Sequence, residues 1–470
     1  MRAFWAIVRL TFKNAMRSHI FQLLLALLIL CIFLIPNTVT GDGTARGFIQ
    51  ISLKYSLASV AFVLSLSSVW LGCYIMSRDV ESYQLHMVIS KPISRVTVWL
   101  GKWTGICLMN GILLVIAALV VYFTVMYQYS QRTFSKEEKD RISCEVLVGR
   151  RVFMPKAPDF DKLASKELPE RIKLLQAEGL SFDENNLLKE MRKEAWLKYC
   201  EIPYKGGRDW VYYNLPADQK ETLFVRYRFY VNKISSEKQR MTHGLWVIGV
   251  PVLAKEKSAN VFERDKVKGD VSFYPRALTQ KPQQYMTGFF HEFTLPGSIV
   301  SPKGEARLSY INADDLRYPI YLQVADGPKV LIKVSGFFEN YCRGIVIIML
   351  QLIILAGLGC AAASFLSMPT AVFMVIAYLI FGSVASYMTS QDNLSGAADY
   401  TAYFVSKVLL FIIIPIQNFE VTQFLANGEL IEISFMGRVF IGYFVLRALP
   451  FILIGIWLYW RRQMGLVIRK

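Results

Sequence analysis

The chain contains six long runs of mostly apolar residues, and these runs limit the folds that are open to it. They cover His19 to Ile35, Ile51 to Met76, Trp103 to Tyr127, Ile345 to Phe365, Ala371 to Met388 and Val439 to Trp460. A helix needs about 20 predominantly apolar residues to cross a hydrocarbon core ~30 Å thick. Hydrophobic residues make up 54% of the whole chain. We therefore expect an α-helical polytopic membrane protein with six transmembrane helices.

The residues before the first apolar run have apolar side chains near helical spacing. The segment from Met1 to Arg17 also carries four basic residues and no acidic one. This pattern predicts a helix that lies in the membrane interface, with its basic side chains toward lipid head groups. A cleaved signal peptide is the alternative, but the apolar run is too long and no small-residue cleavage site follows Phe33 to Pro36. We expect this helix to be retained.

The distribution of basic residues predicts the orientation of the chain in the membrane. Three segments on one side of six spans are rich in them: Arg2, Arg9, Lys13 and Arg17; Arg78, Lys91, Arg95 and Lys102; and Arg461, Arg462, Arg469 and Lys470. The positive-inside rule makes this side cytoplasmic, so both termini are expected in the cytoplasm of a bacterial cell, with the spans in its inner membrane. The acidic segment Thr389 to Gly437 then lies outside. Within it, the stretch Ala397 to Asn427 contains an apolar run that ends at Pro415 and is too short to cross the membrane comfortably. It is suited to a re-entrant or interfacial helix, and we expect a re-entrant helix that dips in from the outside.

A polar insert separates the third and fourth spans. Residues Gln128 to Asn340 contain 35 basic and 28 acidic residues, so most of the net charge of +17 lies elsewhere. The basic excess is a topology signal, and we expect no nucleic acid partner. Two amphipathic helices around Gly179 are predicted first, followed by alternating strands such as Thr222 to Asn232. We expect an extracytoplasmic α+β domain containing a β-sandwich, jelly-roll or immunoglobulin-like, at 128–340, between membrane parts at 1–127 and 341–470.

The stretch Ser77 to Arg95, between the second and third spans, is amphipathic and is stopped by Pro92. Its pattern predicts a short helix at the cytoplasmic surface with a basic rim. An ordinary loop helix resting on lipid is the alternative that the pattern alone leaves open.

The residues of this stretch resemble the first cytoplasmic loop of type-2 ATP-binding-cassette (ABC) exporter permeases, the family of the nitrous-oxide-reductase maturation and gliding-machinery permeases. The similarity rests on Arg78-Asp79-Val80-Glu81-Ser82, on Ile89 to Arg95 and on Gly101-Lys102-Trp103, with Tyr83-Gln84 where a Gly-Thr pair is usual. Two further segments, Ala363 to Pro369 and Ile412 to Val421, resemble the family's turn between the fourth and fifth spans and its segment before the last span.

The resemblance implies a permease that couples ATP hydrolysis by a separate ABC ATPase subunit to movement of a substrate. The loop would be the coupling helix seated in that subunit, through Arg78, Asp79, Glu81, Tyr83, Met87, Lys91, Pro92 and Arg95. It also implies a dimer with a second permease copy or a homologue, and ATP and Mg²⁺ on the partner. No phosphate-binding Gly-x-x-x-x-Gly-Lys-Ser/Thr motif occurs in the chain. We expect no catalytic residue, no directly bound cofactor and no enzyme activity.

Two basic residues in apolar surroundings are further candidates. Arg447 lies deep in the last apolar run, roughly 20 Å from its end, and a charge at this depth is costly. Lys407 lies in the expected re-entrant helix. Both are candidate contacts to substrate or membrane lipids, although Arg447 at the external interface or paired with Glu432, and Lys407 as an interfacial side chain, are simpler alternatives. The partner of Arg447 is left open between helix carbonyls, a lipid phosphate and an anionic substrate group.

The remaining polar residues predict no metal site. The four histidines have no metal-ligand spacing. The aromatic residues Trp210, Tyr212, Tyr213, Tyr227 and Tyr230 are expected in the sandwich core rather than in a ligand platform. The outer domain could also contact a periplasmic protein. A membrane-anchored sensor or scaffold, whose β-domain binds a ligand without transport, is the alternative function, and an integral-membrane enzyme is the weakest.

Overall fold

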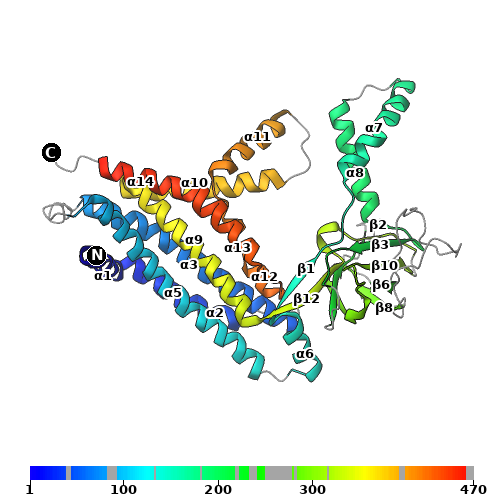
Figure 1. The fold of residues 1–470 in the computed structure, drawn as a ribbon, viewed down its shortest axis with the longest axis horizontal. Helices are drawn as coiled ribbons and strands as arrows, with labels where there is room; N and C mark the ends of the chain where they lie inside the picture. Colours follow the sequence, from blue (N-terminus) through cyan, green and yellow to red (C-terminus); the bar gives the residue numbers. More distant parts are fainter. Residues whose placement is uncertain are drawn as a thin grey trace. The chain divides into compact units, whose positions relative to one another are not determined.

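The computed structural model describes residues 1–38, 44–81, 93–131, 134–179, 183–216, 222–231, 241–248, 278–279, 283–314, 317–390 and 397–461. The chain divides into two compact units: Met1–Gly149 with Ser335–Lys470, and Arg150–Val334. The first unit is helical, and the second holds most of the strands (Figure 1). The helix α6 (Lys136–Glu145) belongs to the helical unit, so the division falls inside the insert expected at 128–340.

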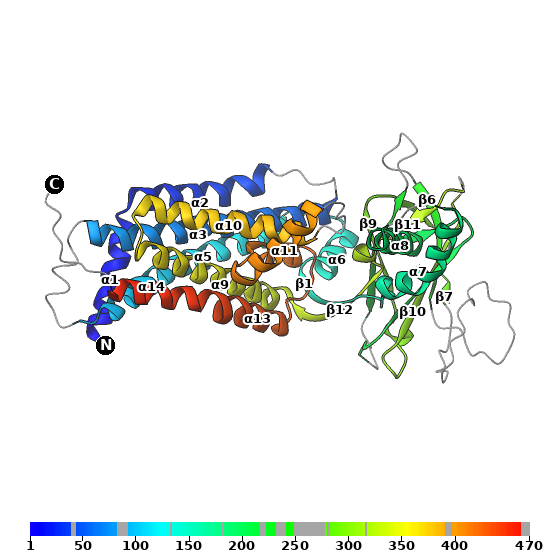
Figure 2. The same cartoon turned by 90° about the horizontal axis from the view of Figure 1, so that it is seen from above.

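Besides α6, the helical unit contains long helices and a few short ones. They are α1 (Arg2–Met16), α2 (His19–Thr38), α3 (Ala45–Glu81), α5 (Arg95–Gln131), α9 (Phe337–Ala363), α10 (Met368–Ser390), α11 (Ala397–Ile412), α12 (Thr422–Ala426), α13 (Ile433–Val439) and α14 (Leu449–Arg461), with a short 3₁₀ turn η3 (Ile416–Phe419) and a π-helical stretch η4 (Phe440–Ala448). Figure 2 shows α2, α3, α5, α9, α10 and α14 running in one common direction, with α1 lying across them.

Five helical stretches among the described residues are long and apolar enough to cross a membrane: Ala45–Arg78, Arg95–Ser130, Phe337–Ala363, Met368–Ser390 and Ile433–Arg461. Two bent pairs pass the same criteria, Arg2–Met16 with His19–Ile35 at 71° and Asp399–Ile412 with Ile416–Ala426 at 51°. Counting each pair as a span gives up to seven. These helices are compatible with a multi-pass membrane protein, and the expected count of six lies within this range.

Small residues let the helices approach closely around α9. A methyl group placed on Gly359 of α9 would lie 2.9 Å from the carbonyl oxygen of Val69 in α3, and one on Gly72 would lie 2.9 Å from the carbonyl oxygen of Ala356. On another side of α9, Gly455 of α14 packs against Ala361 at a distance that leaves no room for a side chain. Within a bilayer, where helices gain little from hydrophobic burial, such small-residue contacts provide the van der Waals packing that holds a bundle together.

Polar contacts join the segments at the end of the bundle where the chain leaves for the second unit. Arg46 at the start of α3 forms a salt bridge with Glu145 of α6. Asn340 of α9 is fully buried, donates to the carbonyl of Glu429 at 2.8 Å and accepts from the backbone N–H of Ile431 at 2.8 Å. The loop after α12 is therefore fixed to the first turns of α9.

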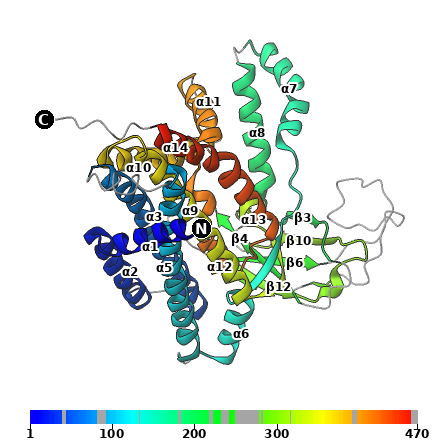
Figure 3. The ribbon, with the colours of Figure 1, turned by 60° about the vertical axis from the view of Figure 1, so that its left-hand side comes forward.

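Twelve strands occur among the described residues. They are β1 (Val148–Phe153), β2 (Glu201–Ile202), β3 (Gly207–Tyr212), β4 (Leu223–Arg228), β5 (Tyr230–Val231), β6 (Met241–Ile248), β7 (Leu278–Thr279), β8 (Gln283–Met286), β9 (Phe290–Leu295), β10 (Ala306–Asn312), β11 (Ile320–Tyr321) and β12 (Lys329–Gly336). They form a sheet of order β1-β12-β4-β9, a sheet of order β3-β10-β6-β7 in which β8 also pairs with β6, and a small sheet of order β2-β11-β5. Figure 3 shows β3, β10 and β6 next to one another in the second of these sheets. The expected jelly roll, which consists of two four-stranded sheets, is not confirmed.

The two larger sheets share one core. In β4 the residues Val225 and Tyr227 enter this core, while Arg226 and Arg228 lie on the other face, as the alternation of the sequence predicted. The ring of Tyr227 lies 4.8 Å from that of Trp246 in the other sheet. Hydrophobic burial between the sheets thus accounts for the packing of this unit.

The two predicted helices around Gly179 are present, but the strand β1 comes before them in the chain, whereas the sequence predicted all strands after them. α7 (Phe160–Ala177) and α8 (Glu184–Cys200) flank Gly179, whose φ of +69° is one that residues with a side chain rarely adopt. Ala164, Leu187 and Met191 form a small buried cluster between them.

Candidate functional site

The predicted ATPase-docking stretch is described only at its two ends. Arg78, Asp79 and Glu81 belong to the end of α3, and Arg95 is the first residue of α5. Tyr83, Met87, Lys91 and Pro92 lie outside the described residues. The site is therefore defined here by the helix ends that carry this stretch.

Both helices that carry the stretch are longer than a membrane span requires. α3 and α5 have 37 residues each, which corresponds to ~55 Å at 1.5 Å per residue, whereas a hydrocarbon core is ~30 Å thick. Neither helix is interrupted. The docking stretch therefore lies between the ends of two long, continuous helices, α3 at Glu81 and α5 at Arg95.

The first turn of α5 is tied to the last turn of α14. Nη1 of Arg95 donates to the carbonyl oxygen of Trp460 at 2.8 Å, which is one of the carbonyls that a helix leaves without an internal partner at its C-terminus. The guanidinium of Arg461 lies 4.3 Å from the ring centre of Trp457. On α3, Arg78 donates to the hydroxyl of Tyr74. Arg95 therefore links the docking stretch to the last helix, 365 residues away in sequence.

Lys102 is buried beside this end, although the positive-inside argument assigned it to the cytoplasmic loop. Its side chain is 3% exposed, and Nζ donates to the carbonyl oxygen of Ile75 in α3 at 3.4 Å. One turn earlier, Nε1 of Trp99 donates to Oγ of Ser364, just after α9, at 3.0 Å. The start of α5 is thus held by polar contacts to α3 and to the end of α9.

The N-terminal helix packs on the same part of α5. Methyl groups placed on Gly101 and Gly105 would lie 2.9 Å from side-chain atoms of Ile7 and Thr11 respectively. These two glycines are four residues apart, which places them on one face of α5 and allows α1 to approach closely. The basic N-terminal helix, the start of α5 and the end of α14 therefore meet at one end of the bundle.

Arg447, the second candidate, lies in η4 and contacts the break between α11 and η3. Its Nη1 donates to the carbonyl oxygen of Ile413 at 3.1 Å, and its guanidinium lies 5.1 Å from the ring centre of Tyr443. Of the partners left open by the sequence, the structure thus shows a backbone carbonyl. Pro415 accounts for the helix end, because a proline disfavours helical backbone in the residue before it. A helix that ends leaves its last carbonyls without internal partners, and Arg447 donates to a carbonyl at this end.

Tyr378 of α10 completes the contacts at this break. Its hydroxyl accepts from the backbone N–H of Ile414 at 3.0 Å and donates to the carbonyl oxygen of Ile412 at 3.3 Å. Three consecutive residues at the break are therefore paired with side chains from two other helical segments. Tyr378 was not among the residues predicted from the sequence, although a tyrosine in an apolar run, combined with a proline that interrupts a neighbouring helix, is a signal for such a contact.

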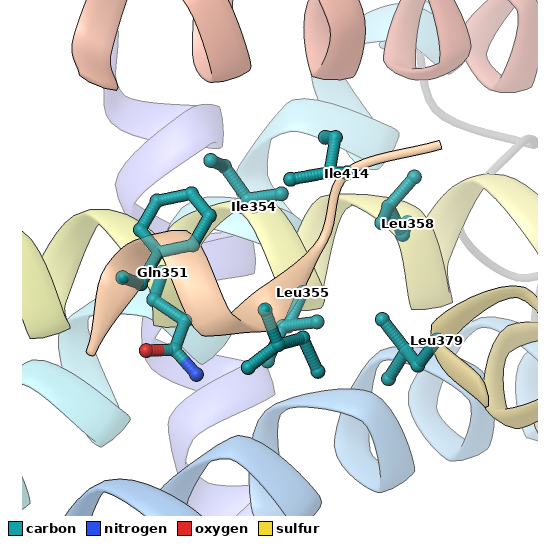
Figure 4. Close-up of a pocket in the computed structure, with 8 residues that line it drawn as sticks. Gln351, Ile354, Leu355, Leu358, Leu379 and Ile414 are labelled. Carbon is teal, nitrogen blue, oxygen red and sulfur yellow. The ribbon is translucent and has the colours of Figure 1, made fainter. Parts of the chain in front are cut away.

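A small cavity adjoins the break. Its volume is about 10 Å³, which is the room for about one water molecule. The lining residues are apolar except for Gln351, and Figure 4 shows Leu355, Leu379 and Ile414 around it. Nε2 of Gln351 donates to Oγ of Ser65 at 3.1 Å. This cavity therefore has no room for a molecule larger than water.

Lys407 and Arg447 are not brought together by any recorded contact. Lys407 is exposed on α11, and its Nζ lies 6.0 Å from the ring centre of Tyr403.

Arg and aromatic side chains of the second unit form structural contacts. Arg150 and Glu292 form a fully buried ion pair, and Arg150 lies 5.2 Å from the ring centre of Phe224. Arg228 donates to Asp326 through Nε at 3.1 Å and Nη2 at 2.7 Å. Among the described residues there is no group of three or more His, Cys, Asp and Glu that could hold a metal ion.

The five aromatic residues considered as a ligand platform divide into two groups. Trp210, Tyr212 and Tyr227 are buried in the sandwich core, as expected, whereas Tyr213 is 47% exposed. Tyr230 donates its hydroxyl to Asp326, and burial together with this carboxylate raises the pKa of Tyr230 to about 12. Three of the five aromatic residues are therefore core residues, as predicted.

Comparison of the chain with protein-family models, with curated proteins and with solved structures finds no match in any of the three.

Proposed function

We propose that this chain is the permease subunit of an ATP-driven ABC exporter, which couples ATP hydrolysis by a separate ATPase subunit to substrate movement across or out of the membrane. The observation that carries the proposal is the mounting of the docking stretch on two uninterrupted helices, with Arg95 linking it to the carbonyl of Trp460 in α14. A segment that receives force from another subunit requires such rigid supports. A loop that merely rests on lipid does not.

The proposed topology has six spans, with both termini in the bacterial cytoplasm and the second unit outside the inner membrane. It is supported by the basic side chains of α1, Arg78, Arg95 and Arg461 near one end of the helices, as the positive-inside rule requires. At the opposite end, the contacts of Arg46 with Glu145 and of Asn340 with the loop after α12 join three segments that this topology assigns to the outside. The pair of α11 and α12 then enters and leaves the membrane on that side.

The proposed assembly contains two permeases, the second being another copy or a homologue, and two ATPase subunits that bind ATP and Mg²⁺. The second unit would receive substrate or contact a periplasmic partner. We propose Arg447 and Lys407 as the basic residues nearest to a substrate or lipid that passes the break, since both are at least partly exposed on apolar helices.

The test is co-purification of the ATPase subunit with the affinity-tagged full chain from its own host. Charge reversals Glu81→Lys and Lys91→Glu change the docking stretch, and Glu170→Lys and Lys173→Glu change exposed residues of α7 as matched controls. We expect the wild type and the controls to retain the ATPase and the docking variants to lose it. Retention by all variants would reject docking at this stretch and would favour the sensor or scaffold function.

A further inference from the structure

The helix α1 has two different faces, and one of them is already occupied within the protein. Ile7, Val8, Thr11 and Ala15 are buried, and Ile7 and Thr11 contact the two glycines of α5. An interfacial helix usually attaches to a membrane by burying its apolar face among the lipids. In this chain the apolar face is used for packing on α5, so attachment by that face is not open to α1.

The opposite face of α1 is basic and exposed. Arg2, Arg9, Lys13 and Arg17 follow one another at intervals of seven, four and four residues, which places them along one side of a helix. All four side chains are exposed, and the first 41 residues of the chain contain no Asp or Glu. Nothing acidic on this helix neutralises the row.

The four basic side chains of α1 lie on the side of the helix that faces away from the bundle. Figure 2 shows α1 lying across the long helices, so it runs parallel to the membrane plane when they cross the membrane. It packs on the flank of α5 at Gly101 and Gly105, beside the buried Lys102. The face that points away from α5 therefore meets the layer of lipid head groups around the protein. Trp5 and Leu10, which are 58% and 53% exposed, flank the basic row and match the amphipathic boundary of that layer.

We propose that the basic face of α1 is a binding surface for the head groups of anionic phospholipids. The phosphate charges of these lipids complement the row of four cations, and a basic residue near an anionic membrane surface contributes about a fivefold preference. This surface does not depend on the proposed transport function, because it needs only that the long helices cross a membrane.

Quenching of Trp5 fluorescence by brominated lipids tests the proposal on the full chain in nanodiscs. One set of nanodiscs contains brominated phosphatidylglycerol and unlabelled phosphatidylcholine. The other set contains unlabelled phosphatidylglycerol and brominated phosphatidylcholine. The signal of Trp5 is the difference from the Trp5→Phe variant. We compare the wild type with the double variant Arg9→Gln and Lys13→Gln, with the charge-conserving double variant Arg9→Lys and Lys13→Arg, and with Arg171→Gln and Lys173→Gln on α7 as a control of equal charge change.

We expect brominated phosphatidylglycerol to quench Trp5 several-fold more than brominated phosphatidylcholine in the wild type, in the charge-conserving variant and in the α7 control. The Arg9→Gln and Lys13→Gln variant should lose most of this preference, by up to about fivefold for each cation removed. In the wild type, salt should reduce the preference by screening, which tests the proposal even when a variant does not fold. The proposal is overturned if both lipids quench Trp5 equally, or if the preference is unchanged in high salt or in the Arg9→Gln and Lys13→Gln variant. It is also overturned if the α7 control loses as much of the preference as that variant does.

Discussion

Nη1 of Arg447 in η4 donates a hydrogen bond to the carbonyl oxygen of Ile413, 3.1 Å away at the broken end of α11. A charge in the middle of an apolar span is costly, and an unpaired carbonyl at the same depth is also costly. The contact reduces both costs at once. It also connects the last helix, whose end is held by Arg95, to the break in α11.

Replacing Arg447 by Leu removes this donor and leaves the carbonyl of Ile413 without its partner. We expect a loss of about 1–3 kcal/mol in the free energy of unfolding, measured as a lower thermal unfolding temperature of the full chain in nanodiscs. Arg438→Leu, at an exposed arginine of α13, is the matched control and should change stability little. If the two variants lose stability equally, the contact of Arg447 with the break does not contribute as described.

Replacing Tyr378 by Phe removes both hydrogen bonds to the break but keeps the ring. We expect a loss of about 1–2 kcal/mol, and a double variant with Arg447→Leu should lose less than the sum of the two single losses, because both side chains act on the same three residues. Chemical unfolding of the four proteins of this cycle gives the interaction free energy. Strict additivity would show that Tyr378 and Arg447 act independently.

The approach of α3 to α9 depends on the absence of a side chain at Gly359. Gly359→Ala places a methyl group 2.9 Å from the backbone oxygen of Val69, so the helices must separate. We expect a loss of about 1–3 kcal/mol and a lower yield of monodisperse protein. Gly437→Ala on α13 is the control, since nothing lies within 4 Å of that position and alanine favours a helix. A Gly359→Ala protein as stable as the control would contradict the packing of these helices.

The second unit should become less stable as the pH falls below about 6.5. Burial lowers the pKa of His291, which hydrogen-bonds the carbonyl of Met286 through Nε2 at 2.7 Å. At low pH the unfolded state therefore binds more protons than the folded state. The neutral ring contributes its full stability above the pKa that His291 has in the unfolded chain, and this stability is lost as the pH falls through the lower pKa of the folded protein. Unfolding followed between pH 8 and 5 should show a smaller loss for His291→Gln, which keeps an N–H donor, than for the wild type. The same loss in both proteins would exclude His291 as the cause.

Much of the local structure could be predicted from the sequence because it follows from periodicity. The apolar runs are helices, the two helices around Gly179 are present, and β4 buries the predicted face. The topology of the sheets could not be predicted, because strand pairing is set by contacts between residues far apart, such as Arg226 with Glu292 across β4 and β9. The jelly roll expected from the sequence is accordingly not confirmed.

In the candidate site, too, some features could be predicted from the sequence and others could not. The deep position of Arg447 was visible in the sequence, but its partner was not, because Ile413 becomes a partner only when Pro415 interrupts α11 in space beside η4. Lys102 was expected in the loop and is buried, since its long side chain reaches the carbonyl of Ile75 on the neighbouring helix. Sequence alone gives the charge of such a residue, whereas the fold decides what it contacts.

Site-specific photo-cross-linking shows whether the docking stretch contacts an ATPase subunit. A photoreactive residue replaces Met87, in the middle of the proposed docking stretch, in the full chain within its native membranes, and another replaces Met286, which is 41% exposed in the second unit. We expect the residue at position 87 to form an adduct with an ATPase subunit and the residue at position 286 to form none. The proposed function is contradicted if position 87 yields no such adduct, or if the residue there reacts with a membrane-impermeant reagent added from outside the intact cell.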